Sequence, residues 1–268
     1  MNLNTSSGRL LNIIEKASKI QSQTNCLDAW SNILEVKDNR PLLFKRLGMV
    51  MTLPLEAKKE LLEIKDIKKK NPYLKWEQPI NNAFLHQNLS AQWNTFSQYI
   101  NQDVIDYLVM ASDMVKFKNP EISLEQSKIN KLKKDFMDIQ DEIEESDIEL
   151  SLKEFMLSRI MDIINSLEES IIKGITPLKD ALNISIGELV MNNKLVTYSK
   201  DNKLAQKFWN LLVNTSVIIT LATGTPQITN NITKLLPFIE INNSQKEKNA
   251  EDIIDIEITN STEETAIV

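Results

Sequence analysis

Apolar residues recur every three or four positions along most of this 268-residue chain, which places them on one face of an α-helix. Turn signals, several of them prolines, divide the first half into separate segments. The helices predicted there cover residues 7–21, 27–36, 41–51, 55–70, 80–89, 92–100 and 103–116. Because the chain has only five glycines, too few for the turns of a sheet protein, the pattern predicts an all-α, multi-helix bundle.

The strongest periodic signal lies in the middle of the chain. Its apolar residues have the heptad spacing of a coiled-coil seam, and they are Ile129, Leu132, Phe136, Ile139 and Ile143. Ser151 and Glu154 form a capping box, which indicates that a new helix begins there. We therefore expect a central helical hairpin with arms over 123–145 and 152–173, whose seam closes within the chain or against a second copy. One continuous helix over 123–173 is the alternative.

Two more helices are predicted after the hairpin, over residues 177–198 and 202–223. Gly187 lies inside the first of them, where glycine costs about 1 kcal/mol, and close approach of a neighbouring helix would offset that cost. Residues 241–268 are polar and acidic, which is typical of a disordered tail. The expected organisation is an N-terminal helical region (1–120), the hairpin with a C-terminal bundle (121–240), and the tail.

Residue types that carry catalysis are scarce. Gly174 and Gly187, the closest two glycines, are thirteen positions apart, so the chain has no glycine-rich phosphate loop. The single histidine, His86, has no nucleophile beside it in sequence, and the single cysteine, Cys26, cannot form an internal disulfide. We therefore expect no enzymatic activity, no cofactor and no metal site, and we expect a reducing, cytoplasmic location.

Charge is distributed unevenly within a net charge of −6. Residues 37–75 hold eleven basic and five acidic side chains, whereas residues 135–169 hold two basic and twelve acidic ones. A lysine-rich helix over 58–75 therefore offers a possible nucleic-acid contact, and its candidate residues are Lys65, Lys68, Lys69, Lys70 and Trp76. Acidic residues dilute this cluster and the chain has four arginines, so a solvated helix surface is the favoured interpretation.

The apolar run over 208–223 is sixteen residues long, shorter than the roughly 20 residues that cross a bilayer. A buried core helix is the favoured interpretation. A membrane-active, pore-forming protein that inserts the helix over 202–223 is the alternative. The first residues do not have the pattern of a signal peptide, which agrees with the expected cytoplasmic location.

These exclusions favour protein–protein interaction as the function, in a scaffold, adaptor or regulatory partner. The excess of lysine over arginine, 27 to 4, indicates an AT-rich bacterial genome. In the tail, Ile254, Ile256 and Ile258 alternate with acidic residues, a pattern that suits addition to the sheet edge of a partner. The expected partner is another protein or a second copy of the chain, as a homodimer, with nucleic acid and membrane as the less favoured alternatives.

Overall fold

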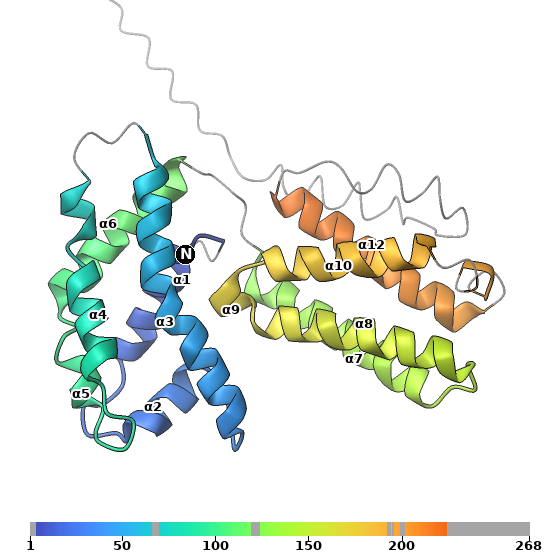
Figure 1. Ribbon diagram of the computed structural model, residues 1–268, viewed down its shortest axis with the longest axis horizontal. Helices are drawn as coiled ribbons and strands as arrows, with labels where there is room; N and C mark the ends of the chain where they lie inside the picture. The colour runs from blue at the N-terminus through green and yellow to red at the C-terminus, as the bar shows by residue number, and fades with distance from the viewer. Residues whose placement is uncertain are drawn as a thin grey trace, which may run out of the picture.

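The computed structural model describes residues 4–65, 70–118, 124–191, 194, 196–198 and 202–223. Within these ranges the regular secondary structure is helical, apart from one isolated bridge between Asn25 and Gln92, so the all-α prediction is confirmed. Figure 1 shows two groups of helices, which we call the N-lobe (residues 4–118) and the C-lobe (residues 124–223). The N-lobe comprises α1 (Ser6–Ser18), α2 (Cys26–Ile33), α3 (Arg40–Glu63), the 3-10 helix η1 (Asn71–Leu74), α4 (Glu77–His86), α5 (Asn94–Ser97) and α6 (Gln102–Lys118). The C-lobe comprises α7 (Gln126–Glu144), α8 (Leu150–Glu168), α9 (Ser170–Lys173), α10 (Thr176–Met191) and α12 (Lys203–Thr223).

Aromatic side chains fill the centre of the N-lobe. The Trp30 ring packs against the rings of Phe84, Trp93 and Phe96, with centroids 5.9, 5.2 and 5.1 Å away. The Trp93 indole donates to the Ala17 carbonyl at 3.1 Å, which joins this cluster to α1. Rings of this size bury much apolar surface, and a buried indole N–H requires an acceptor, so the cluster fixes both the packing and the orientation of α1.

One helix, α3, replaces two predicted ones. Sequence reasoning ended a helix at residue 51 because of Pro54, but Pro54 lies buried inside a continuous helix. The missing N–H and the ring clash cost about 3 kcal/mol in a helix interior. Burial of Leu53, Pro54 and Ala57 in the lobe offsets that cost.

The same helix ends earlier than predicted, at Glu63. Ile64 is extended, with φ −70° and ψ 107°, and its side chain is buried with Leu61 and Val115. The predicted lysine-rich helix over 58–75 is therefore interrupted, because burying Ile64 requires the chain to turn. Residues 71–74 form a single 3-10 turn instead.

The central hairpin is confirmed, and a continuous helix over 123–173 is excluded. Helices α7 and α8 pack against each other, and residues 145–149 connect them. The predicted capping box of Ser151 and Glu154 is wrong, because Ser151 does not lie at the N-cap position. Helix α8 already begins at Leu150, and the Ser151 hydroxyl donates to the Glu149 carboxylate at 2.8 Å. The heptad residues are buried in a core that α7 shares with α8, α10 and α12, rather than in a two-helix seam, and they are Ile129, Leu132, Phe136, Ile139 and Ile143.

Two glycines differ sharply in their surroundings. A Cβ added to Gly187 would meet nothing within 4 Å, so the predicted close approach of a neighbouring helix is wrong. Gly174 ends α9 with φ 72°, and a Cβ there would lie 2.7 Å from Nη1 of Arg9. The special contact expected at Gly187 therefore exists at Gly174.

The apolar helix α12 is part of the C-lobe core. Asn202 caps it by accepting from the Ala205 N–H at 2.9 Å. Its buried side chains include Phe208, Trp209 and Leu212. Among the described helices, none combines the length and hydropathy that a membrane crossing requires.

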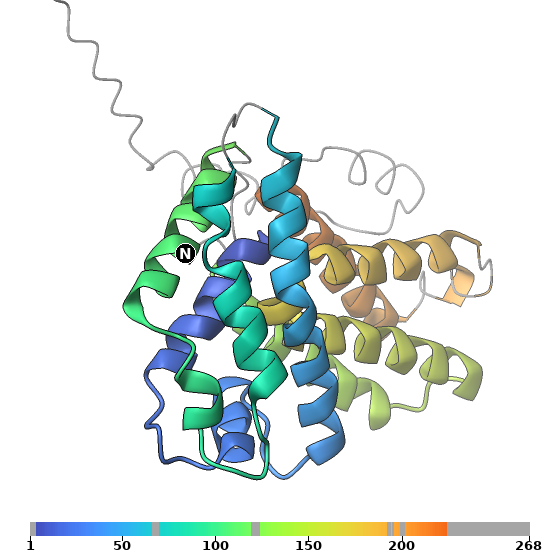
Figure 2. The ribbon, with the colours of Figure 1, turned by 60° about the vertical axis from the view of Figure 1, so that its left-hand side comes forward.

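The two lobes meet around α9. Ile172 of α9 is buried in the hydrophobic cluster of the N-lobe, although α9 continues directly from α8 of the C-lobe. Figures 1 and 2 both show α9 between the lobes. The domain boundary near residue 120 stays a prediction, and residues 241–268 lie outside the described part of the chain.

Candidate protein-interaction surface on α3

The 24-residue helix α3 carries a row of exposed apolar side chains. The exposed fractions are 49% for Phe44, 47% for Met51, 73% for Leu55 and 44% for Leu62. Together with Gly48 and Lys58, these residues follow one another at steps of four, three, four, three and four. Such a heptad pattern lets one helix lie lengthwise against another. We call the six residues, Phe44, Gly48, Met51, Leu55, Lys58 and Leu62, the α3 stripe.

A second heptad set on α3 faces the N-lobe core. Each of its members immediately precedes a member of the α3 stripe, and all are buried: Leu43, Leu47, Val50, Pro54, Ala57 and Leu61. Successive residues point about 100° apart around a helix, so the α3 stripe lies on the flank of α3 next to its buried face. The helix thus uses one heptad set for its own lobe, while the four large apolar side chains of the stripe remain exposed.

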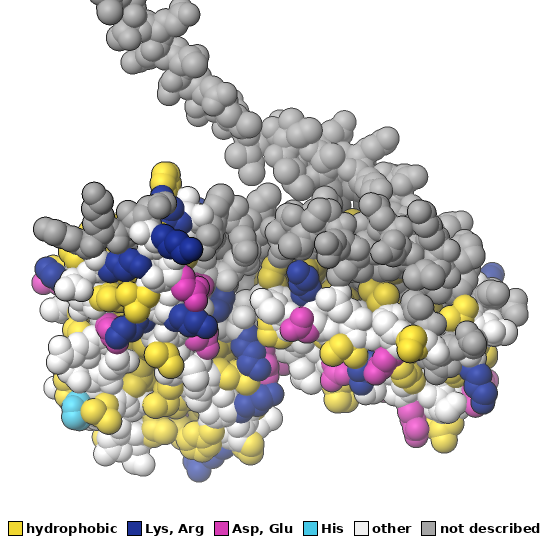
Figure 3. Space-filling view, turned by 45° about the horizontal axis from the view of Figure 1, so that its top comes forward, with side chains coloured by type: hydrophobic (Ala, Val, Ile, Leu, Met, Phe, Trp, Pro, Cys, Tyr) yellow, Lys and Arg dark blue, Asp and Glu magenta, His cyan; other side chains and the backbone are white. Residues whose placement is uncertain are grey.

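One end of the α3 stripe lies beside α4. Helix α4 runs beside α3 in both ribbon views, and Lys58 of the stripe pairs with Glu77 at the start of α4 at 2.7 Å (Figures 1 and 2). In the space-filling view, hydrophobic side chains reach the surface of both lobes among polar and charged ones (Figure 3). A row of large apolar side chains at contact spacing differs from the singly scattered ones of an ordinary surface.

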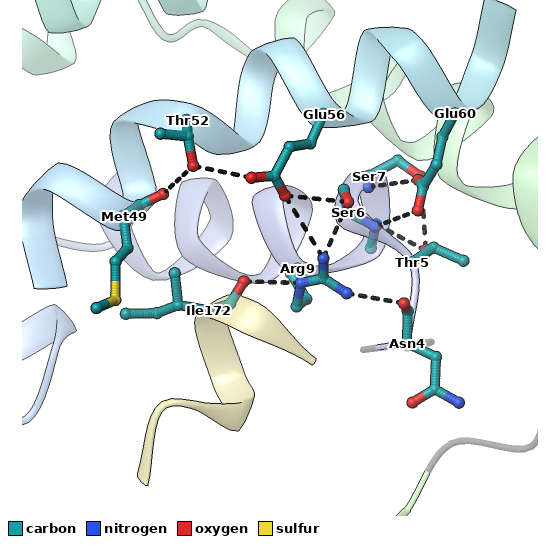
Figure 4. A network of polar contacts seen from close by, with 11 residues as sticks. Asn4, Thr5, Ser6, Ser7, Arg9, Met49, Thr52, Glu56, Glu60 and Ile172 are labelled. Atoms are coloured by element: carbon teal, nitrogen blue, oxygen red, sulfur yellow. Dashed lines mark hydrogen bonds and ion pairs between the residues drawn. The ribbon is translucent and has the colours of Figure 1, made fainter. Parts of the chain in front are cut away.

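A buried arginine holds the side of α3 that faces α1. Arg9 Nε donates to the Ile172 carbonyl at 2.8 Å, Nη1 donates to the Asn4 carbonyl at 2.7 Å, and Nη2 donates to the Ser6 hydroxyl at 2.9 Å (Figure 4). Glu56 of α3 lies 3.8 Å from Nη2. Burial lowers the pKa of Arg9, while Glu60 and Glu56 act to raise it. The guanidinium therefore connects α1, α3 and α9 at a single point.

Glu60 of α3 caps the first turn of α1. Its carboxylate accepts from the Ser6 N–H at 2.7 Å and from the Ser7 N–H at 3.2 Å (Figure 4). A carboxylate at a helix N-terminus accepts hydrogen bonds from the free backbone N–H groups of the first turn, and its negative charge interacts favourably with the positive end of the helix dipole. Because Glu60 lies only two residues before Leu62, this cap helps to hold the end of the α3 stripe in place.

Ion pairs hold α3 against the C-lobe. Lys45 Nζ lies 2.6 Å from Glu169, which also pairs with Lys173 at 2.8 Å. Burial acts to raise the pKa of Glu169, but the bonds and charges of Lys173 and Lys45 outweigh burial and lower it. The neighbouring Arg46 pairs with Glu168 at 3.0 Å. With α3 held on two sides by buried polar groups, the α3 stripe is presented on a preorganised helix.

The structure describes three of the five residues predicted to contact nucleic acid, which are Lys65, Lys70 and Trp76. Trp76 is completely buried, so its ring cannot stack on a base. Lys70 donates to the Leu62 carbonyl, and Lys65 follows the end of α3. Lys68 and Lys69 lie outside the described residues.

The other candidates for chemistry have ordinary surroundings. His86 is exposed and stacks on Tyr99 with ring centroids 5.6 Å apart. Burial raises the pKa of the Cys26 thiol to about 11, against a smaller opposite effect from Thr95. In the part of the chain that the structure describes, no three histidine, cysteine or acidic side chains are grouped as metal ligands would be. The tail candidates Ile254, Ile256 and Ile258 fall outside that part.

No family model, curated protein or solved structure matches this chain. Sequence reasoning missed the α3 stripe because it divided α3 at Pro54, which separated Phe44 and Met51 from Leu55 and Leu62. The heptad spacing across that proline was the signal that could have revealed it.

Proposed function

We propose that this chain is a non-enzymatic protein that acts through protein–protein interaction, and that the α3 stripe is its contact surface. The observation that supports this most is the row of four exposed apolar side chains at heptad spacing on one held helix. The reducing cytoplasm of a bacterium suits a protein whose single cysteine is buried and unpaired.

We further propose that a second copy of the chain covers the stripe. If two α3 helices pair antiparallel around a two-fold axis at the level of residue 53, Phe44 faces Leu62 of the second copy and Met51 faces Leu55. Gly48 then faces Lys58, so the residue without a side chain lies opposite the longest one. The stripe is thus complementary to itself, as an isologous interface requires.

The size of the stripe sets the expected strength of association. From Phe44 to Leu62 the stripe spans 18 steps, about 27 Å along the helix at 1.5 Å per residue. A single helix pair of this length buries less than the roughly 800 Å² per partner of a standard interface. We therefore expect a reversible dimer with a dissociation constant on the order of micromolar.

Sedimentation equilibrium tests the proposal over protein concentrations from about 1 µM to about 300 µM. We expect the mass to rise from one chain to two, and Leu55→Asp to shift that rise to at least tenfold higher concentration. Leu150→Asp is the matched control, because Leu150 is a leucine of similar exposure, 68%, on the C-lobe helix α8. This control should associate like the unaltered chain.

Two results would overturn the proposal. One is a single-chain mass at every concentration, which would mean that no second copy covers the stripe. The other is equal weakening by Leu55→Asp and Leu150→Asp, which would mean that added negative charge, and not the stripe, governs association.

A further inference from the structure

We propose that the two lobes open and close about α9, and that Glu168 is the clasp that holds them closed. Apolar contact joins the lobes at one main point. Among the described residues, Ile172 is the one C-lobe side chain in the buried cluster of the N-lobe, and the buried cluster of the C-lobe holds no N-lobe side chain. Lobes of one chain commonly move relative to each other unless the surface between them is large and hydrophobic. The small apolar contact therefore favours lobes that move as units.

Helix α9 has the features of a pivot. The buried Ile172 side chain and the bond from Arg9 Nε to the Ile172 carbonyl, at 2.8 Å, attach it to the N-lobe. Glu169 alone separates it from α8, and Gly174 and Ile175 separate it from α10. Residues at the ends of elements are typical hinges, because they absorb changes in backbone angles. Helices α8 and α10 can therefore turn together while α9 stays on the N-lobe.

A cleft of about 340 Å³, which we call the lobe cleft, lies between the lobes next to this pivot. Its N-lobe wall is the turn between α2 and α3 together with Arg46, and its C-lobe wall is the start of α7 and the end of α8. The Glu168 carboxylate spans the lobe cleft, since it accepts from Arg46 Nη2 of the N-lobe at 3.0 Å and from Lys133 Nζ of α7 at 2.5 Å. The other ion pair between the lobes, Lys45 with Glu169, lies at the pivot itself. Widening of the lobe cleft therefore requires that the Arg46–Glu168 pair separates.

Two features of the clasp limit its strength. Arg46 Nε is buried and has no hydrogen-bond partner among the described residues, which destabilises the closed state, and water that enters a wider cleft satisfies this donor. The Glu168 and Lys133 side chains are 29% and 37% exposed, so dissolved ions reach the clasp. The screening length falls from about 10 Å at 0.1 M salt to about 3 Å at 1 M. Rising salt should therefore open the lobes and expose Leu42 and Ile171, two half-buried apolar residues that line the lobe cleft.

Single-molecule energy transfer in the full chain tests this motion. Dyes are attached to Asn94→Cys on α5 and Asp147→Cys in the turn between α7 and α8, two exposed positions at the outer ends of the two lobes (Figure 1), while the buried Cys26 stays unlabelled. We expect one population at about 0.1 M sodium chloride, and a second population with a different transfer efficiency that grows as the salt rises to about 1 M. The protein is measured at about 1 nM, far below the micromolar range of the proposed dimer, so the result does not depend on self-association.

Glu168→Gln should raise the ratio of open to closed chains about tenfold at low salt, because the clasp loses its charge. Glu188→Gln is the matched control, since Glu188 also pairs with an arginine, Arg159 at 3.4 Å, but within the C-lobe. This control should behave like the unaltered chain.

Three results would overturn the proposal. The first is a single population at every salt concentration. The second is a Glu168→Gln ratio that equals that of the unaltered chain or of Glu188→Gln. The third is a second population that appears only when circular dichroism shows a loss of helix, because that population would be unfolded and not open.

Discussion

Replacing Gly174 by alanine should destabilise the protein severely, although it adds a single methyl group. Gly174 has φ 72° and ψ −162°, a backbone conformation that is almost restricted to glycine. The added Cβ would also lie 2.7 Å from Arg9 Nη1 and 3.3 Å from Arg9 Cζ. Alanine therefore requires both a strained backbone and a displaced guanidinium.

Each of these effects has a known size. The backbone strain costs about 1–3 kcal/mol. Displacement of Arg9 weakens its bonds to the carbonyls of Ile172 and Asn4, and one hydrogen bond to a charged group contributes about 1.5–3 kcal/mol. We expect a total loss of roughly 3–5 kcal/mol, a large share of the 5–15 kcal/mol that stabilises a typical protein.

Urea denaturation followed by circular dichroism measures this loss, with Gly187→Ala as the matched control. Gly187 lies inside α10, and its Cβ would meet nothing within 4 Å, so alanine there should stabilise the protein by about 1 kcal/mol. The two substitutions add the same methyl group and should shift the midpoint in opposite directions. If Gly174→Ala changed the free energy of unfolding by less than about 0.5 kcal/mol, the role assigned to Arg9 at the junction of α1, α3 and α9 would be wrong.

Three further predictions concern α3, its ion pairs and the cysteine. Gly48→Leu should stabilise the folded chain, because a Cβ at Gly48 meets nothing within 4 Å. The same variant should weaken self-association at least tenfold in sedimentation equilibrium, because the new leucine then faces Lys58 of the second copy. Glu169 should contribute to the free energy of unfolding. This contribution is fully present above the ordinary pKa of 4.5 and is lost as the pH falls through the lower pKa of the folded state. Glu169→Gln should remove this part of the pH dependence when the free energy of unfolding is measured at decreasing pH. The Cys26 thiol, buried and with its pKa raised to about 11, should resist iodoacetamide in the native protein and react once the protein is unfolded, as mass spectrometry would show; rapid native labelling would contradict its burial.

The helical class and most helix positions could be predicted from the sequence, because apolar periodicity reports directly on which face of a helix is buried. Pro54 shows where that reasoning fails. A proline ends many helices, but here burial in the lobe outweighs the lost hydrogen bond, and this depends on distant residues that pack against α3. The predicted end of this helix was wrong for the same reason. Ile64 is buried beside Val115, and this distant contact ends α3 earlier than the local sequence preference indicates.

The polar contacts between elements could not be predicted at all. Arg9 donates to the Ile172 carbonyl across 163 positions of sequence, and Arg46 pairs with Glu168 across 122. No local pattern marks such pairs, because each depends on how the two lobes meet. The α3 stripe is an intermediate case, since its heptad spacing is visible in the sequence but its exposure is not.

Disulfide cross-linking tests the antiparallel pairing of α3 most directly. Met51→Cys and Leu55→Cys chains are prepared separately, mixed and oxidised; the native Cys26 is buried and does not interfere. A disulfide needs the two Cα atoms about 5.5–6 Å apart, so it reports the register of the pair. We predict that the mixture forms a covalent dimer joining one variant to the other, whereas each variant alone forms little. Equal cross-linking of each variant with itself, or none in the mixture, would contradict the proposed contact surface.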